Sequence, residues 1–172
     1  ITKIKVLNGR YLKKDIKGYD ILKFPLKIDN VTSKGKFMWF TLSNGDNTYY
    51  MLTTFGLTGK CYLPTGSIWY LPTGSIETLD EEETCNVKFV TKKGNKEQNV
   101  CFSDMRNFGT IEFTNDINVL NKKLNKLERD LLQNPPTLNE FKESFKEIKN
   151  KKKKIVVVLM AQNVKEGIGS GL

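Results

Sequence analysis

The chain has 172 residues, and its 28 Lys and Arg residues outnumber its 19 Asp and Glu residues, which gives a net charge of +9. No stretch approaches the roughly 18 consecutive apolar residues that cross a bilayer, so we do not expect a membrane-spanning protein. The absence of histidine excludes serine–histidine and cysteine–histidine catalysis. The basic surplus favours nucleic acid as a partner, with the lysine-biased composition of an AT-rich genome as the alternative explanation.

Three cysteines, Cys61, Cys85 and Cys101, lie far apart and form no CxxC pair. Together with the lack of histidine, this spacing predicts no zinc site within the chain. An odd, dispersed set of cysteines is typical of buried free thiols in a reducing compartment. No signal-peptide pattern follows Ile1, and we expect an intracellular protein of the nucleus, the cytoplasm or a viral replication site that is not secreted.

Up to about residue 116 the residue pattern is typical of β-strands. The segments 36–42 and 48–53 carry aromatic and β-branched residues and are bounded by turn signals, and an Asn-Gly pair at residues 44–45 between them is a strong hairpin signal. A second turn signal at residues 92–95 predicts another hairpin. The predicted strands are 36–42, 48–53, 86–91, 98–103 and 109–114. These short strands predict a sandwich or a barrel.

Beyond residue 116 the apolar residues recur at helical spacing, starting at Val119 and Leu120 and continuing to Leu131 and Leu132. Pro135 and Pro136 end this helix. A second helix is predicted to begin at Thr137, because Glu140 three residues later completes a capping box. A third helix is predicted over 155–162. The fold class is therefore α+β: a β-sandwich over residues 1–116, followed by a partial helical domain over residues 117–172.

Three short segments, in the same order along the chain, resemble motifs of the Fpg/Nei family of DNA glycosylases (formamidopyrimidine-DNA glycosylase and endonuclease VIII-like proteins). They are Lys34–Phe37 (KGKF), Thr54–Gly59 (TFGLTG) and Asp104–Thr110 (DMRNFGT). A fourth segment, Leu159–Gln162 with the glycine-rich residues after it, is similar to the family's helix-two-turn-helix region. The resemblance implies a family β-sandwich without its first helix, followed by the start of a helix-two-turn-helix domain.

The resemblance also implies a wedge that fills the space left when a damaged nucleotide is flipped out of the duplex. Its residues would be Leu57, Arg106 and Phe108, with Arg106 bonding the orphaned base and Phe108 stacking beside it. The alternative for Leu57 and Phe108 is core packing, and the alternative for Arg106 is a surface salt bridge. Asp104 is expected to hold the wedge loop through backbone hydrogen bonds.

Further positions match family residues that contact DNA. Lys36 resembles a lysine that contacts a phosphate and in some members assists the chemistry, with a solvated strand-edge lysine as the alternative. Thr54 replaces a histidine. The lysine run 151–154 either follows phosphates or is a solvated charge run. The residues assigned to DNA contacts are Leu57, Arg106, Phe108, Lys34, Thr54, Lys152 and Lys153. Four glycines are expected to permit tight turns and close approach to DNA: Gly35, Gly56, Gly59 and Gly109.

The family's nucleophile is an N-terminal proline amine, whereas the five prolines of this chain are all internal. We therefore expect an internal fragment that binds double-stranded DNA with an oxidised base or an abasic site, as a monomer and away from membranes, without cutting it. The parent is expected to be a bifunctional glycosylase and AP lyase for oxidised bases. No cofactor is expected in this chain, and a zinc finger of the parent would lie beyond Leu172. A non-catalytic paralogue that recognises abasic or distorted DNA is the alternative, and a general single-strand binder is a third reading.

Overall fold

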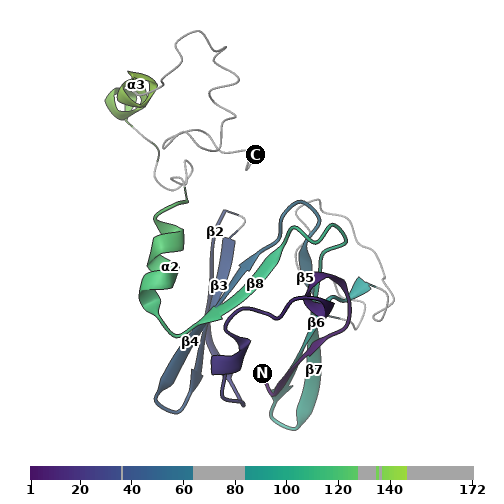
Figure 1. The fold of residues 1–172 in the computed structure, drawn as a ribbon. Helices are drawn as coiled ribbons and strands as arrows, with labels where there is room; N and C mark the ends of the chain where they lie inside the picture. The colour runs from purple at the N-terminus through teal and green to yellow at the C-terminus, as the bar shows by residue number, and fades with distance from the viewer. Residues whose placement is uncertain (36, 64–83, 128–134, 136, 147–172) are drawn as a thin grey trace. The chain divides into compact units, whose positions relative to one another are not determined.

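The computed structural model describes residues 1–35, 37–63, 84–127, 135 and 137–146. Eight strands form two four-stranded antiparallel sheets, with the strand orders β1-β6-β7-β5 and β2-β3-β4-β8 (Figure 1). The strands are β1 Lys3–Val6, β2 Lys27–Lys34, β3 Phe37–Asn44, β4 Asn47–Thr54, β5 Lys60–Tyr62, β6 Val87–Lys93, β7 Lys96–Ser103 and β8 Thr110–Thr114. The helices are η1 Gly9–Leu12, η2 Tyr19–Ile21, α2 Ile117–Leu124 and α3 Leu138–Lys146.

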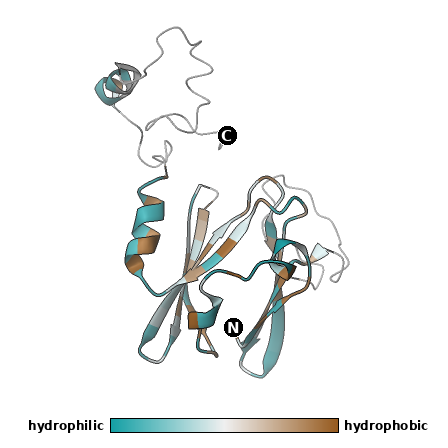
Figure 2. Cartoon of the chain, in the orientation of Figure 1, coloured by the Kyte–Doolittle hydropathy of each residue, from teal (hydrophilic) through white to brown (hydrophobic). Residues whose placement is uncertain are grey.

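The core of the sandwich lies between the two sheets and is made by inward-facing residues of both. One sheet contributes Ile4, Val87, Phe89 and Phe102, and the other contributes Leu42, Met51, Ile111 and Phe113. Core residues of one strand are two positions apart, as are Val87 and Phe89 in β6 and Ile111 and Phe113 in β8, because successive side chains of a strand point to opposite faces. Figure 2 shows the complementary pattern, with hydrophilic residues at the tips of the β3–β4 and β6–β7 hairpins.

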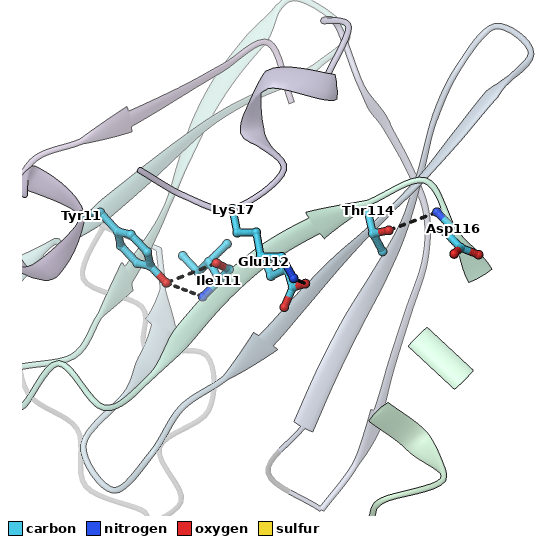
Figure 3. A network of polar contacts seen from close by, with 6 residues as sticks. All are labelled: Tyr11, Lys17, Ile111, Glu112, Thr114 and Asp116. Atoms are coloured by element: carbon cyan, nitrogen blue, oxygen red, sulfur yellow. Dashed lines mark hydrogen bonds and ion pairs between the residues drawn. The ribbon is translucent and has the colours of Figure 1, made fainter. Parts of the chain in front are cut away.

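Polar contacts attach the segment between β1 and β2 to β8 (Figure 3). The hydroxyl of Tyr11 bonds both the amide and the carbonyl of Ile111, and Lys17 forms an ion pair with Glu112. The amide of Phe113 donates to the carbonyl of Lys17 at 2.8 Å. Because this segment runs along the free edge of β8, that edge is covered, which protects it from pairing with another chain.

Gly18 makes this close approach possible. Its φ is +73°, and a Cβ at this position would lie 2.0 Å from the carbonyl oxygen of Phe113. Only glycine combines a left-handed backbone with the absence of a side chain at such a contact.

Both predicted hairpins and the predicted last strand are present, so the sandwich prediction is confirmed. Three strands were not predicted: β1, β2 and β5. The capping box is also confirmed, since the amide of Thr137 donates to Glu140 Oε2 at 2.7 Å and the amide of Glu140 donates to Thr137 Oγ1 at 3.2 Å. The first predicted helix is present as α2, which ends at Leu124 and is followed by a turn at residues 125–127, and the rest of the predicted helix lies outside the described residues. The predicted helix over 155–162 lies outside the described residues.

One prediction about the cysteines is wrong. Cys85 and Cys101 form a disulfide, with their Cα atoms 5.5 Å apart, and only Cys61 is a free thiol. The disulfide arises because Cys85 lies just before β6 and Cys101 lies in β7, and these two strands are paired. A spacing of 16 residues does not reveal that pairing in the sequence.

The chain divides into two compact units, Ile1–Leu120 and Asn121–Leu172. Neither α2 nor α3 has the length and apolarity of a bilayer-crossing helix, and no other helix of that kind occurs in the described residues. The same part of the chain contains no group of three or more metal-binding side chains.

Candidate nucleic-acid interface

The strand register brings the three motif segments to one end of the sandwich. Lys34 is paired with Phe37, Phe37 with Thr54, and Thr54 with Thr110, so these residues form one row across four strands. The β2–β3 turn, the loop at residues 55–59 and the loop at residues 104–109 all begin or end at this row. Figure 1 shows that the last two loops lie together where β4 ends and β8 begins. Lys36 itself lies outside the described residues.

A single carboxylate joins the two loops. Asp104 is 2% exposed, and its Oδ1 accepts hydrogen bonds from the Thr58 hydroxyl at 2.6 Å and from the Arg106 amide at 3.2 Å. Its Oδ2 accepts from the amide of Gly109. The expectation that Asp104 holds its own loop is confirmed. The contact with Thr58 was not predicted, and it ties the 55–59 loop to the 104–109 loop.

Asn86 holds the start of the same loop. Its side chain is 8% exposed, and Oδ1 accepts a hydrogen bond from the amide of Asp104. Asn86 was not among the predicted site residues, because it belongs to none of the motifs. No local signal indicates that it contacts a residue 18 positions further along the chain.

The glycines of the two loops allow this close packing. A Cβ on Gly56 would lie 2.9 Å from Cβ of Phe108, and a Cβ on Gly109 would lie 2.8 Å from the carbonyl oxygen of Thr54. Gly59 has even less space, with the Phe55 carbonyl oxygen 2.2 Å from such an atom. Gly35 differs from these three, because nothing lies within 4 Å of its Cβ position. Three of the four glycines therefore serve contacts within the protein.

The loops expose apolar side chains at this end of the sandwich. Leu57 is 69% exposed and Phe108 is 58% exposed, so neither packs in the core. Met105, which was not predicted to belong to the site, is 83% exposed. The Arg106 guanidinium lies 5.1 Å from the centroid of the Phe108 ring, in a cation–π contact. Within the described residues Arg106 forms no ion pair, so the alternatives of core packing and a surface salt bridge do not hold here.

The hydroxyl of Thr54 is used inside the sheet. It lies 2.8 Å from the Thr110 hydroxyl and accepts a hydrogen bond of 3.1 Å from the Thr110 amide. This arrangement ties the end of β4 to the start of β8. Lys34 is half-buried at the end of β2, in the same row. Lys152 and Lys153 lie outside the described residues.

Comparison with known proteins gives the family. The model of the formamidopyrimidine-DNA glycosylase N-terminal domain matches residues 1–111, which include the two loops described above. The chain belongs to this family. No curated protein matches it by sequence.

Solved structures of Lactococcus lactis Fpg show the same fold. The protein in complex with DNA containing an abasic site has a TM-score of 0.61 and 20% identity, over 97% of this chain and 55% of that chain. The protein non-covalently bound to DNA containing an AP site has a TM-score of 0.61 and 22% identity, over 98% of this chain and 57% of that chain. A complex with DNA containing an oxidised pyrimidine has a TM-score of 0.59 and 19% identity, over 95% and 54%. This glycosylase family chain therefore spans about half the length of these proteins.

Proposed function

We propose that this family member binds double-stranded DNA at an abasic or oxidised site and fills the gap in the base stack with side chains of its two loops. The observation that carries the proposal is the exposure of Leu57 and Phe108, together with the Arg106 guanidinium over the Phe108 ring. Exposed apolar side chains beside a cation are suited to unstacked bases next to phosphates.

The arrangement suits a wedge because it is held in place before DNA arrives. Taking a nucleotide out of the stack costs a few kcal/mol, which contacts with the protein must offset. Asp104 fixes both loops, and the cation–π contact orients Arg106 and Phe108, so little side-chain freedom is lost on binding. The guanidinium then offers its donors to the unpaired base, and Leu57 supplies apolar volume.

The net charge of +9 supports the phosphate contacts of this proposal. We assign such contacts to Lys34, Lys36, Lys152 and Lys153, and a secondary role at the phosphates to Thr54. The Fpg structures with similar folds hold DNA with an abasic site or an oxidised pyrimidine, which supports damaged duplex DNA as the ligand.

Glycosylase and AP lyase chemistry is proposed for a longer protein, and it requires a nucleophile. A proline amine at the N-terminus can form an imine with the sugar, whereas an internal proline nitrogen is part of an amide and is not a nucleophile. All five prolines of these 172 residues are internal. Borohydride treatment of the 172-residue chain with abasic-site DNA is therefore expected to trap no covalent adduct. A trapped adduct would contradict this assignment of the nucleophile.

Binding itself is tested by fluorescence anisotropy on two duplexes that differ only in one tetrahydrofuran abasic analogue. The wild-type chain is expected to prefer the abasic duplex, and Arg106→Ala is expected to weaken that binding about tenfold with little effect on the intact duplex. Lys93→Ala is the control, because Lys93 lies at the tip of the β6–β7 hairpin, at the opposite end of β7 from the 104–109 loop. Equal losses on both duplexes would reduce Arg106 to a phosphate contact, and a wild-type chain without any preference would contradict the proposed function.

A further inference from the structure

Arg10, one of the three arginines of the chain, forms hydrogen bonds with the 104–109 loop, which lies far from it in the sequence. Its Nη1 donates to the carbonyl oxygen of Asn107 at 3.2 Å and to that of Gly109 at 3.3 Å. Its backbone amide donates to Oδ1 of Asn107 at 2.9 Å. Arg10 thus bonds the residues on both sides of Phe108 and binds Asn107 through both its backbone and its side chain.

The hydrogen bonds from Arg10 matter for the loop because of the backbone conformation of Asn107. Its φ of 55° is in the left-handed region, which L-residues adopt rarely and Asn adopts more easily than most. Asn107 separates Arg106 from Phe108, so its conformation sets the direction of both side chains. The two bonds between Arg10 and Asn107 stabilise this conformation from outside the loop.

Gly9 brings Arg10 close enough for these bonds. Its φ is +80°, and a Cβ there would lie 2.5 Å from Oδ1 of Asn107 and 2.2 Å from Nδ2 of Asn86. The 3-10 turn η1 is therefore packed directly on the loop. The Arg10 guanidinium also lies 5.8 Å from the centroid of the Tyr11 ring, which keeps the side chain against the protein.

We infer that Arg10 is a positioning residue for the wedge: it holds the carbonyls on either side of Phe108 and so sets how Arg106 and Phe108 are presented to DNA. This inference rests on the proposed function. The competing role for an arginine at this end of the sandwich is a direct phosphate contact. The two roles differ in a measurable way, because a phosphate contact changes the salt dependence of binding, whereas a positioning residue changes the preference for the abasic duplex.

The test uses the 172-residue chain, both duplexes and a series of salt concentrations. Arg10→Ala removes two hydrogen bonds to the loop, so it is expected to reduce the preference for the abasic duplex roughly tenfold. The slope of log K against log salt is expected to stay unchanged. Lys13→Ala is the matched control, since it removes an exposed cation three residues away and is expected to leave the preference unchanged. Thermal unfolding of each variant shows whether it folds.

Arg10→Lys keeps the charge, but a single ammonium lacks the planar guanidinium that reaches both carbonyls. We expect Arg10→Lys to keep part of the preference for the abasic duplex. If Arg10→Ala does not fold, the preference of Arg10→Lys is measured in its place. A double variant of Arg10→Ala and Arg106→Ala measures whether the two residues act together. If Arg10 acts through the wedge, Arg10→Ala reduces the preference for the abasic duplex less in the Arg106→Ala background than in the wild type.

Three results would overturn the inference while leaving the proposed function intact. They are an unchanged preference in Arg10→Ala, a salt slope reduced by about one with equal losses on both duplexes, and full recovery of the preference by Arg10→Lys. A wild-type chain that does not distinguish the two duplexes would instead contradict the proposed function, so the two failures are distinguishable.

Discussion

The hydroxyl of Thr58 donates a hydrogen bond of 2.6 Å to Oδ1 of Asp104 and so joins two loops that are 46 residues apart in the sequence. The same carboxylate accepts the amides of Arg106 and Gly109. A buried carboxylate is costly unless its oxygens are bonded, and here three donors satisfy it. The two loops therefore form one unit that depends on the acceptor capacity of Asp104.

Asp104→Asn is expected to break this unit. The amide that replaces Oδ1 or Oδ2 cannot accept a hydrogen bond, so at least one buried donor loses its partner. We expect the free energy of unfolding to fall by about 3 kcal/mol, as measured by urea denaturation. Asp46→Asn, in the exposed β3–β4 turn, is the control and is expected to change it by less than about 0.5 kcal/mol. Equal effects of the two substitutions would show that Asp104 does not join the loops in solution.

Leu57→Ala is expected to separate binding from stability. Leu57 is 69% exposed, so its truncation is expected to change the free energy of unfolding by less than about 0.5 kcal/mol while weakening binding to the abasic duplex. Leu52, five residues earlier on β4, is 1% exposed, and Leu52→Ala is expected to cost about 2–5 kcal/mol. Measuring both quantities for both variants checks the assignment. If Leu57→Ala destabilises the fold as Leu52→Ala does, Leu57 is a packing residue and not part of a wedge.

The sandwich was predictable from local sequence signals where those signals are strong. The Asn-Gly turn and the aromatic segments on each side of it predicted β3 and β4 to within two residues at each end. Strand β2 was not predictable, because it is an edge strand that is mostly exposed on both faces and lacks an alternating apolar pattern.

The site was predictable only in part, since motif resemblance indicated the wedge residues but not what supports them. Without the motif, core packing would have been the favoured prediction for Phe108, whereas its side chain is 58% exposed. Arg10 contacts Asn107 across 97 positions, and Asn86 contacts Asp104 through the register of β6 and β7. Contacts of this kind arise from how the strands pair, which a single sequence does not show.

The disulfide between Cys85 and Cys101 is expected to stabilise the sandwich. In the chain-entropy account, closing a loop of this size constrains the unfolded chain by about 3 kcal/mol. Urea unfolding with and without reductant is expected to show this difference for the wild type and none for the Cys85→Ala, Cys101→Ala double variant. Titration of the unreduced, denatured wild type is expected to find one free thiol, that of Cys61. Three free thiols would contradict the bond.

The hydroxyl of Tyr11 is expected to contribute to the attachment of the N-terminal segment to β8 (Figure 3). Tyr11→Phe leaves the amide and carbonyl of Ile111 without this partner, so we expect a loss of about 1–3 kcal/mol in the free energy of unfolding. Tyr50→Phe is the control, on a half-buried tyrosine of β4. The Lys17–Glu112 ion pair beside Tyr11 is expected to add little, because the Lys17 side chain is 75% exposed. A similar loss in both tyrosine variants would remove any special role for the Tyr11 hydroxyl.

Cys61 is expected to make stability depend on pH under alkaline conditions. Burial raises the pKa of its thiol from 9.0 to about 12, so the folded chain keeps a proton that the unfolded chain releases. Stability is therefore unaffected by this group below about pH 9 and falls as the pH rises from about 9 towards 12. Cys61→Ala removes this contribution, and the difference in unfolding free energy between the two proteins, measured from pH 8 to 11, isolates it from other ionising groups. Parallel pH profiles would show that the Cys61 thiol ionises normally in the folded chain.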